Sequence, residues 1–473
     1  MRTPPLASGP EGPRALRPLL TTVLDALGDG TRERGGPLPA GGPETVAARM
    51  RDALGDVLPD EGDPEALRHL VRALAEGSAD PADPLCAAHL HCPPLAVAAA
   101  ADLAASVLNP SLDSWDQAPA ASELERLLTR VLANEVYGDP SRGAGNCATS
   151  HDGAAADNAP DALVTTGGTE SNQLALLLAR ETFGAGVRLI HGANAHHSLS
   201  RSAWLLGLPD PVTVPAPAGT LDPAALDAAL TDLPGPHLVA ATAGTTDAGL
   251  IDPLPEIAAV CRTHGARLHI DAAYGGGLLF STRHRDKLTG LSAAATVTLD
   301  LHKLGWQPVA AGLLAVQDAR DLAALRQRAD YLNADDDTEA GLPDLLGRSL
   351  RTTRRPDALK IAVTLKTLGR TGLGRLVDQV CARATEFAQL VQGQPGFELH
   401  DAPTISTVLF RPAHATDDDI AAVRRKLLTD GRAVLGRARL DGRLWLKATL
   451  LNPHTRPDDL AALLKVVEGT TRR

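Results

Sequence analysis

A segment that could hold a phosphate group runs from Thr165 to Asn172. It reads TTGGTESN and leads from a strand-like run into a helical pattern. Backbone N–H groups at the start of a helix attract anions, Gly167 and Gly168 let the backbone come close, and the Thr169 hydroxyl can donate. The same pattern is also typical of an ordinary helix start with a hydroxyl cap. It is neither a GxGxxG nor a Walker sequence, so it does not indicate a nucleotide.

Asp271 and Lys303 are ionisable residues that each follow an apolar, strand-like run. A carboxylate at the end of a buried strand lies where α/β sheets bind ligands, and Asp271 could hold a protonated pyridine nitrogen there. Loss of water around a lysine favours the neutral amine, so Lys303 could attack an aldehyde. The alternatives are an aspartate that caps a turn and a surface lysine that extends into solvent.

A histidine and a threonine follow two other strand-like runs. His196, in the run AHHS, could stack on an aromatic cofactor or move protons, although a structural role is the alternative. Thr246, in AGTTDAG, offers a hydroxyl group at the same sheet edge. A phosphate cradle, an imidazole, a hydroxyl, a carboxylate and an amine thus occur in the order that a pyridoxal-phosphate site needs.

The elements that position these residues are predicted by the hydrophobic pattern. From residue 161 onward, short β-type runs alternate with helical segments, which predicts an α/β architecture with a mainly parallel sheet. The runs are ALVTT, VRLIH, HLVAATA, RLHID, ATVTLD and GLLAV. Helical patterns are predicted at 44–58, 64–77, 95–107 and 119–136, and two more meet at Gly369–Gly374. Towards the C-terminus the order strand, helix, strand, strand, helix predicts a smaller α+β domain.

These patterns divide the chain into four predicted parts. Residues 1–43 are rich in Pro and Gly and read as a flexible arm, and 44–85 form an N-terminal helical segment. A large cofactor-binding domain follows at 86–370, and a small C-terminal domain at 371–473. Within the large domain, the polar run 138–160 is predicted to be a loop.

Composition limits the function classes. The 473 residues carry a formal net charge of −11, which argues against binding to nucleic acid or to an anionic membrane. The five cysteines are scattered without a CxxC pair, so neither a disulfide framework nor a metal site is expected. The longest apolar stretch, 95–108, contains Asp102 and is too short to span a bilayer. With no signal-peptide pattern at the N-terminus, a cytoplasmic protein is expected.

Five separated motifs resemble those of a known family. TTGGTESN, AHHSLSRSA, TAGTTDAGLIDPL, HIDAAYGG and DLHKLGWQP follow the order of the motif series in the group II pyridoxal-phosphate decarboxylases. The resemblance covers about residues 85–465. It implies the type I, aspartate-aminotransferase-like fold, with a mainly parallel seven-stranded sheet in the large domain. It also implies a homodimer with its active site at the interface and with the N-terminal helical segments swapped.

The resemblance implies roles for individual residues. Lys303 carries pyridoxal 5'-phosphate, Asp271 holds the pyridine nitrogen, and His196 stacks on the ring. The other cofactor-binding positions are Gly167, Gly168, Thr169, Thr246, Ala273 and His302. Family members that act on aromatic substrates carry a tyrosine on a mobile loop, but the corresponding loop at about 332–352 has none. The proton donor is therefore either His196 or Tyr331, which stands at the edge of that loop.

We therefore predict a carboxy-lyase of amino acid metabolism that converts an L-amino acid to its amine and CO2. Stretches at 89–95, 109–125, 349–360 and 450–460 look closest to the diaminobutyrate and siderophore-type lysine decarboxylases. They favour 2,4-diaminobutyrate, lysine or ornithine over an aromatic amino acid. Asp113 or Asp116 is the candidate partner of a terminal ammonium, whereas Asp335, Asp336 and Asp337 are expected to face solvent.

Two other readings stay open at this stage. An aminotransferase or a carbon–carbon lyase would share Lys303 and Asp271, but transamination usually needs an arginine clamp for the retained carboxylate, and none is evident. A non-catalytic scaffold would be expected to have lost part of the set Lys303, Asp271 and His196, which is intact. The stretch 145–158 has no counterpart that we can identify in the family.

Overall fold

The computed structural model describes residues 3–138, 159–327 and 329–471, which form two compact units. The large unit comprises Pro94–Gln379, and the small unit combines Met1–Pro93 with Val380–Arg473. The N-terminal helical segment, predicted as a part of its own, thus shares a unit with the C-terminal part of the chain. The four-part division remains a prediction from the sequence.

The large unit is built on a seven-stranded sheet with the strand order β2-β8-β7-β6-β5-β3-β4. β8 is antiparallel to both of its neighbours, and every other pairing is parallel, which confirms the mainly parallel α/β sheet. β5 and β7 are buried along their whole length, as expected for continuous apolar strands covered on both faces. The bounds are β2 Asp161–Thr165, β3 Arg188–Gly192, β4 Val212–Val214, β5 His237–Thr242, β6 Arg267–Ala272, β7 Thr296–Asp300 and β8 Gly312–Val316.

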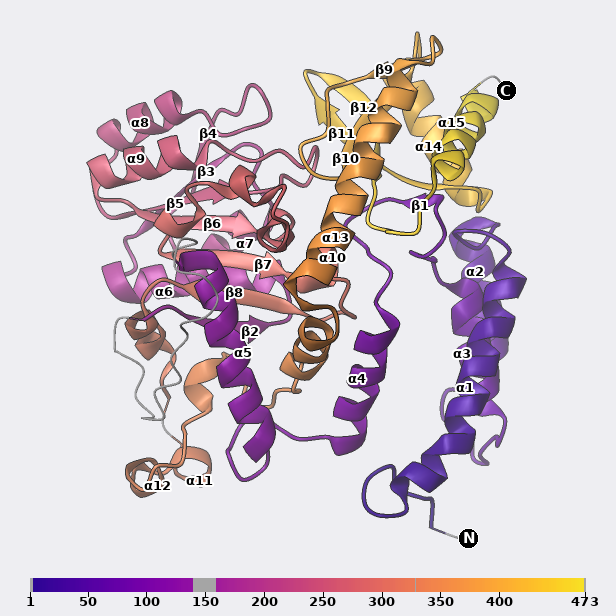
Figure 1. Cartoon of the computed structure of the whole chain (residues 1–473), viewed down its shortest axis with the longest axis horizontal. Helices are drawn as coiled ribbons and strands as arrows, with labels where there is room; N and C mark the ends of the chain where they lie inside the picture. The colour runs from indigo at the N-terminus through magenta and orange to yellow at the C-terminus, as the bar shows by residue number, and fades with distance from the viewer. Residues whose placement is uncertain (1–2, 139–158, 328, 472–473) are drawn as a thin grey trace. The chain divides into compact units, whose positions relative to one another are not determined.

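Helices cover this sheet (Figure 1). Within α6, Leu174 and Leu178 pack with Leu314 of β8, whereas Leu176 packs with Leu189 of β3. α9 contacts β5 and β6, and α5 contacts β2 and β8. The bounds are α4 Ala96–Leu108, α5 Pro119–Tyr137, α6 Gly168–Phe183, α7 Ser198–Leu205, α8 Pro223–Asp232, α9 Leu254–His264, α10 Leu301–Leu304, α11 Asp330–Asn333, α12 Asp335–Glu339 and α13 Ala358–Gln392, with 3-10 turns η2 Gly275–Phe280, η3 Arg285–Leu288, η4 Leu291–Ala293, η5 Ala319–Leu325 and η6 Leu346–Arg348.

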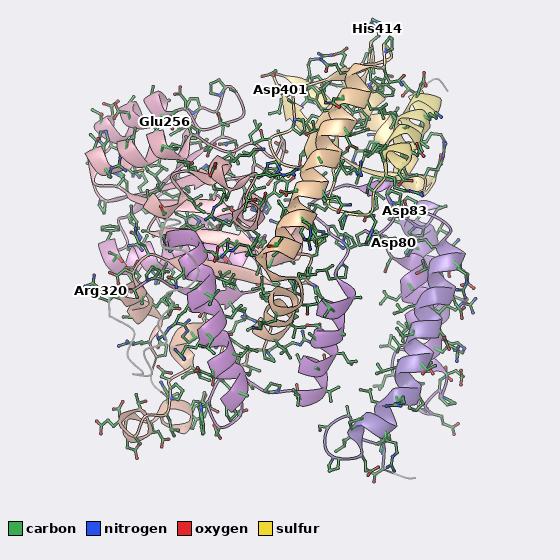
Figure 2. The ribbon with its side chains drawn as sticks, in the orientation of Figure 1. Asp80, Asp83, Glu256, Arg320, Asp401 and His414 are labelled. Carbon is green, nitrogen blue, oxygen red and sulfur yellow. The ribbon has the colours of Figure 1, made fainter. Side chains whose placement is uncertain are left out.

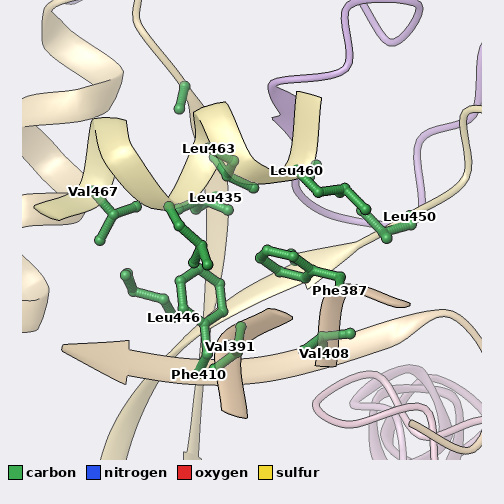
Figure 3. Packing of buried hydrophobic residues seen from close by; sticks show 14 of the residues in the cluster. Phe387, Val391, Val408, Phe410, Leu435, Leu446, Leu450, Leu460, Leu463 and Val467 are labelled. Atoms are coloured by element: carbon green, nitrogen blue, oxygen red, sulfur yellow. The ribbon is translucent and has the colours of Figure 1, made fainter. Parts of the chain in front are cut away.

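The small unit contains a five-stranded sheet with the order β1-β11-β12-β10-β9, covered by helices. Its core is aliphatic and aromatic, and Phe387 meets the ring of Phe410 edge-on with centroids 5.2 Å apart (Figure 3). This is the predicted α+β arrangement. The bounds are α1 Gly12–Arg34, α2 Gly42–Leu54, α3 Ala66–Gly77, β1 Cys86–Ala87, β9 Phe397–Leu399, β10 Thr407–Pro412, α14 Asp417–Thr429, β11 Val434–Leu440, β12 Arg443–Thr449 and α15 Pro457–Thr471.

Helix α1 lies where the sequence predicts a flexible arm. The Pro and Gly residues that suggest flexibility stand before residue 14 and after residue 34, apart from Pro18 and two glycines inside the helix. At one of these, Gly30, a Cβ atom would lie 2.3 Å from the Arg72 carbonyl oxygen, so the glycine allows α1 to approach α3. At the end of α1, Arg34 donates at 2.6 Å to Asp80, which follows α3 and is labelled in Figure 2.

The remaining differences from the sequence prediction are small. β4 and β9 have three residues each and lacked a pattern long enough to predict. The predicted meeting point of two helical patterns at Gly369–Gly374 is confirmed, because α13 is interrupted at Gly369, where φ is 62°. Most of the predicted loop at 138–160, with the stretch 145–158, lies outside the described residues. No helix in the described ranges is both long enough and apolar enough to cross a membrane.

Candidate active site

Six strands of the large unit end at one edge of the sheet, and five of them lead into predicted site residues. β3, β5, β6 and β7 are parallel, and β2 points the same way because β2 and β7 are both antiparallel to β8. The segments that follow these strands carry the Gly167 turn, His196, Thr246, Ala273 and Lys303, respectively. The structure therefore brings every predicted cofactor-binding residue to the same sheet edge, which is where α/β folds bind ligands. Tyr331 lies on α11, and the candidates Asp113 and Asp116 lie between α4 and α5.

The Gly167–Gly168 turn lies against α10 and the end of β6. A Cβ atom on Gly167 would be 2.8 Å from His302 Cε1, and φ at Gly167 is 153°, so both space and backbone conformation require glycine. A Cβ atom on Gly168 would be 3.1 Å from Ala273 Cβ and 3.2 Å from Asp300 Oδ2. Glu170 accepts from both the N–H and the hydroxyl group of Thr166 and thereby fixes this entry into α6.

Lys303 forms an ion pair with Asp300, a residue that the sequence reasoning did not assign. Lys303 Nζ is 2.9 Å from Asp300 Oδ2, and the Asp300 side chain is only 2% exposed. His302 Nε2 is 3.5 Å from the same oxygen. Burial lowers the pKa of His302, and its Nδ1 accepts from the Ala311 N–H at 3.3 Å. The short helix α10 thus places an imidazole and an ammonium on one buried carboxylate.

Asn172 is the centre of a buried hydrogen-bond network behind Asp271. Its Nδ2 donates to Asp271 Oδ2 at 2.8 Å and to Ser198 Oγ at 2.9 Å. Its Oδ1 accepts from Thr298 Oγ1 at 2.9 Å and lies 3.0 Å from His269 Nε2. Because burial lowers the pKa of His269 to about 4, this ring is neutral and Nε2 carries the proton. With the Ala273 N–H also donating to Asp271, the carboxylate is fixed in orientation.

The same network continues to His196. Ser198 Oγ accepts from Asn172, so its own hydroxyl proton can be donated to His196 Nδ1, 2.8 Å away. The Ser198 backbone N–H also points to Nδ1, at 3.3 Å. Burial lowers the pKa of His196, so at neutral pH its ring is uncharged. Nδ1 is then an acceptor and Nε2 carries the proton.

Three other predicted residues lie close to solvent. Thr169 and Thr246 share the sheet edge but are exposed. Tyr331 is 82% exposed and lines a cavity of about 510 Å³ together with Leu177 and Arg180. None of the other predicted site residues lines that cavity.

Asp252 is a further residue that the sequence reasoning missed. Its carboxylate accepts from Asn194 Nδ2 and from the Leu221 and Thr242 N–H groups, at 2.7–2.9 Å. It thereby connects the segment before His196 to the end of β5. Burial raises the pKa of this carboxyl group. Asp252 is the second Asp of the motif TAGTTDAGLIDPL, so the residue was visible in the sequence, but its hydrogen-bond partners were not.

A family model described as the pyridoxal-dependent decarboxylase conserved domain matches residues 49–413, well over half of the chain. The chain belongs to this family. The decarboxylase is 37% identical over 437 residues to an L-2,4-diaminobutyrate decarboxylase of Rhizobium meliloti (strain 1021), which covers 88% of this chain and 84% of that protein. It is 31% identical to a protein of the same name from Acinetobacter baumannii, with 86% and 84% covered.

A solved structure of the glutamate decarboxylase domain of a diaminobutyrate-pyruvate transaminase and L-2,4-diaminobutyrate decarboxylase from Vibrio parahaemolyticus superimposes on the decarboxylase with a TM-score of 0.84. The two chains are 29% identical, with 99% of this chain and 97% of that one covered. The type I fold predicted from the motifs is thereby confirmed. The chain is a lyase that uses pyridoxal phosphate to decarboxylate an amino acid.

The residues of this decarboxylase fit its cofactor. The turn at Gly167 and Gly168 would hold the phosphate through its backbone, because neither glycine carries a side chain of its own and the neighbouring side chains leave little room for one. Asp300 Oδ1, buried beside this turn, has no hydrogen-bond partner among the described residues, so it could accept a hydrogen bond from a bound group while ionised, or donate one when protonated. At the adjacent strand, Asp271 presents an oriented carboxylate that suits a protonated ring nitrogen.

Proposed function

We propose that this decarboxylase acts on a diamino acid, with 2,4-diaminobutyrate as the first candidate and lysine or ornithine next, and that Lys303 carries the cofactor. The observation that carries the substrate class is the buried carboxylate of Asp113. The residue is 9% exposed, and no basic side chain forms an ion pair with it among the described residues. A buried carboxylate without a cation is costly, and a substrate ammonium would supply the missing charge.

The surroundings of Asp113 support this role over that of Asp116. Gln117 Nε2 donates to Asp113 Oδ1 at 2.6 Å and so fixes the carboxylate. Asp116 is exposed and accepts from the Ser114 hydroxyl at 2.5 Å. The names of the two relatives, both diaminobutyrate decarboxylases, favour the same substrate class.

The chain's own groups have distinct proposed tasks. Asp271, held by Asn172 and the Ala273 N–H, keeps a positive charge on the ring nitrogen, and the Gly167–Gly168 turn with Thr169 and His302 holds the phosphate. Pyridoxal phosphate, when bound, supplies an aldehyde for linkage to Lys303 and a ring that accepts the electrons left when CO2 departs.

His196 is proposed to stack on the ring and to deliver the proton that the substrate Cα needs after CO2 has left. Its Nδ1 is occupied by Ser198, so Nε2–H is the side that can donate. Tyr331 is the alternative donor. If His196 is the donor, Tyr331→Phe should leave kcat within about threefold of the parent, whereas His196→Gln should lower kcat by about 10²-fold or more. The reverse pattern would assign the proton to Tyr331.

We further propose a homodimer with the active site at the subunit interface. Two large apolar side chains support this. They lie at the end of α7, the helix that begins two residues after His196: Trp204 is 75% exposed and Leu205 is 55% exposed. Exposed apolar side chains of this size commonly mark interaction surfaces.

The reaction is tested with purified protein, added pyridoxal phosphate and a panel of L-amino acids, by measuring CO2 and amine. Amine from diaminobutyrate, lysine or ornithine that disappears in Lys303→Ala would support the proposal. Activity confined to aromatic acids would overturn the substrate class. A keto acid product without CO2 would overturn the assigned reaction.

The role of Asp113 is tested by Asp113→Asn, with Asp116→Asn as the matched control. We expect KM for diaminobutyrate to rise by about 10- to 100-fold in Asp113→Asn, as for removal of one buried charge pair. KM for 2-aminobutyrate, which lacks the second ammonium, should change little. Equal loss for both substrates would show a structural role.

A further inference from the structure

The carboxylate of Asp300 occupies the same corner as the proposed phosphate cradle. Its Oδ2 would lie 3.2 Å from a Cβ atom on Gly168, and its Oδ1 3.7 Å from a Cβ atom on Gly167. The side chain is 2% exposed, with Oδ2 paired to Lys303 and with no hydrogen-bond partner for Oδ1 in the part of the chain that the structure describes. A phosphate in the cradle would therefore be next to a buried carboxylate of the same charge sign.

Cofactor loading changes the charge partner of Asp300. In the structure its counter-charge is the Lys303 ammonium, 2.9 Å away. The ammonium and the cofactor aldehyde give a positively charged C=N link and one water, so forming the bond neither takes up nor releases a proton. The nitrogen is then committed to the cofactor and cannot stay as the three-donor partner of Asp300. Like charges brought this close favour protonation of one of them.

We propose that Asp300 is the counter-ion of Lys303 before cofactor loading and takes up one proton when pyridoxal phosphate binds, so that its Oδ1 donates a hydrogen bond to the phosphate. This inference rests on the proposed role of Lys303. It makes Asp300 a positioning residue that releases the lysine only to a ligand carrying both an aldehyde and an anion.

Several titratable groups surround Asp300 and could compete for the proton. Asp300 ends β7, directly before α10, which carries His302 and Lys303, and Lys360 of α13 acts electrostatically on His302. Across the sheet edge, Asp300 and Asp271 both act on His196. At the start of α6, Glu170 is paired with Arg351. Among these, His302 is the one whose protonation would equally favour a phosphate, so the test must separate it from Asp300.

The experiment measures pyridoxal phosphate binding to cofactor-free protein at several values between about pH 6.5 and about pH 8.5, by the visible absorption of the bound cofactor. Uptake of one proton weakens binding as pH rises, because the bound state holds the extra proton. The parent Kd should therefore increase by up to about tenfold per pH unit. Calorimetry in two buffers of different ionisation enthalpy counts the protons directly.

Asp300→Asn should bind the cofactor with a Kd that is nearly independent of pH, whereas Asp210→Asn, an exposed control, should behave like the parent. A pH dependence that survives in Asp300→Asn but disappears in His302→Gln would assign the proton to His302 and overturn the inference. Absence of proton uptake by the parent would also overturn it, even if the Asp300 variant fails to fold. Failure of a different kind, with a borohydride-reducible link still formed in Lys303→Ala, would reject the proposed role of Lys303 itself.

Discussion

Asn172 orients two residues with different proposed roles. Asp271 would hold the ring nitrogen of the cofactor, and His196 would stack on the ring and deliver a proton. One amide N–H fixes Asp271 and the other polarises Ser198, which in turn holds His196. Its carbonyl oxygen is committed to Thr298 and His269. An amide flip would break four contacts at once. The pairing of carboxylate and imidazole is therefore set by one side chain, not by either residue alone.

Replacing Asp271 with Asn tests this arrangement at the ring nitrogen. The variant keeps the size of the side chain but removes the charge that would hold the pyridine protonated. We expect kcat to fall by about 10²–10³-fold, as for loss of one preorganised electrostatic contact. Decarboxylation kinetics should be measured together with bound cofactor, because a protein that retains cofactor but loses rate supports the assigned role. An unchanged kcat would contradict it.

His269 makes the stability of the large unit depend on pH. Its pKa is lowered from 6.5 to about 4, mainly by burial, so the unfolded chain binds more protons than the folded protein between these values. Stability is therefore full above about pH 6.5 and is lost as pH falls towards 4, by about 3 kcal/mol in total. Urea unfolding at several pH values should show this slope in the parent. His269→Gln should reduce it, and an equal slope in both would disprove the assignment.

The local sequence pattern predicted which segments are helices and strands, but it did not predict the hydrogen-bond network around Asn172. The strands near Asp271 and Lys303 were predicted because continuous apolar runs and their bounding glycines are properties of neighbouring residues. Asn172 ends the motif TTGGTESN, but the sequence predicted no role for it, because its partners come from β6, β7 and α7, which the chain brings together only on folding. Asp300 was not assigned for a different reason: it stands only three residues before Lys303, but its burial, which makes the pair important, is not visible in the sequence. Helix α1 was missed because the composition of 43 residues was averaged over a helix and its Pro- and Gly-rich flanks.

A buried ion pair connects α5 to the segment before α13. Arg354 Nη1 donates to both carboxylate oxygens of Glu125, at 2.8 and 3.0 Å, and the two side chains are 2% and 5% exposed. Glu125→Ala would leave a buried guanidinium without its counter-charge, and we expect a loss of about 3–5 kcal/mol in unfolding free energy. The pair Glu125→Leu with Arg354→Met should recover most of that loss. A double variant as unstable as Glu125→Ala would show that the loss comes from packing.

At the scale of the whole molecule, the net charge of −11 and the exposed apolar side chains on α7 have opposite effects on self-association. The charge favours separation of chains, so stable association needs a specific apolar contact. The exposed face of α9, with Glu256, is charged by comparison (Figure 2). These features predict a dimer that forms through a limited apolar region near α7 and not through non-specific hydrophobic association.

Trp204→Glu tests that prediction on the intact chain. Placing a charge at the Trp204 position should weaken self-association by about 30- to 1000-fold, corresponding to about 2–4 kcal/mol for loss of a central tryptophan. Sedimentation velocity over a range of protein concentrations should show the parent at twice the mass of one chain and the variant shifted towards one. Ala259→Glu on the exposed side of α9 should remain dimeric. A variant as dimeric as the parent would place α7 outside the interface, and a monomeric parent would reject the homodimer. Because the active site is proposed at that interface, loss of the dimer should also reduce decarboxylation at low protein concentration and restore it as concentration rises.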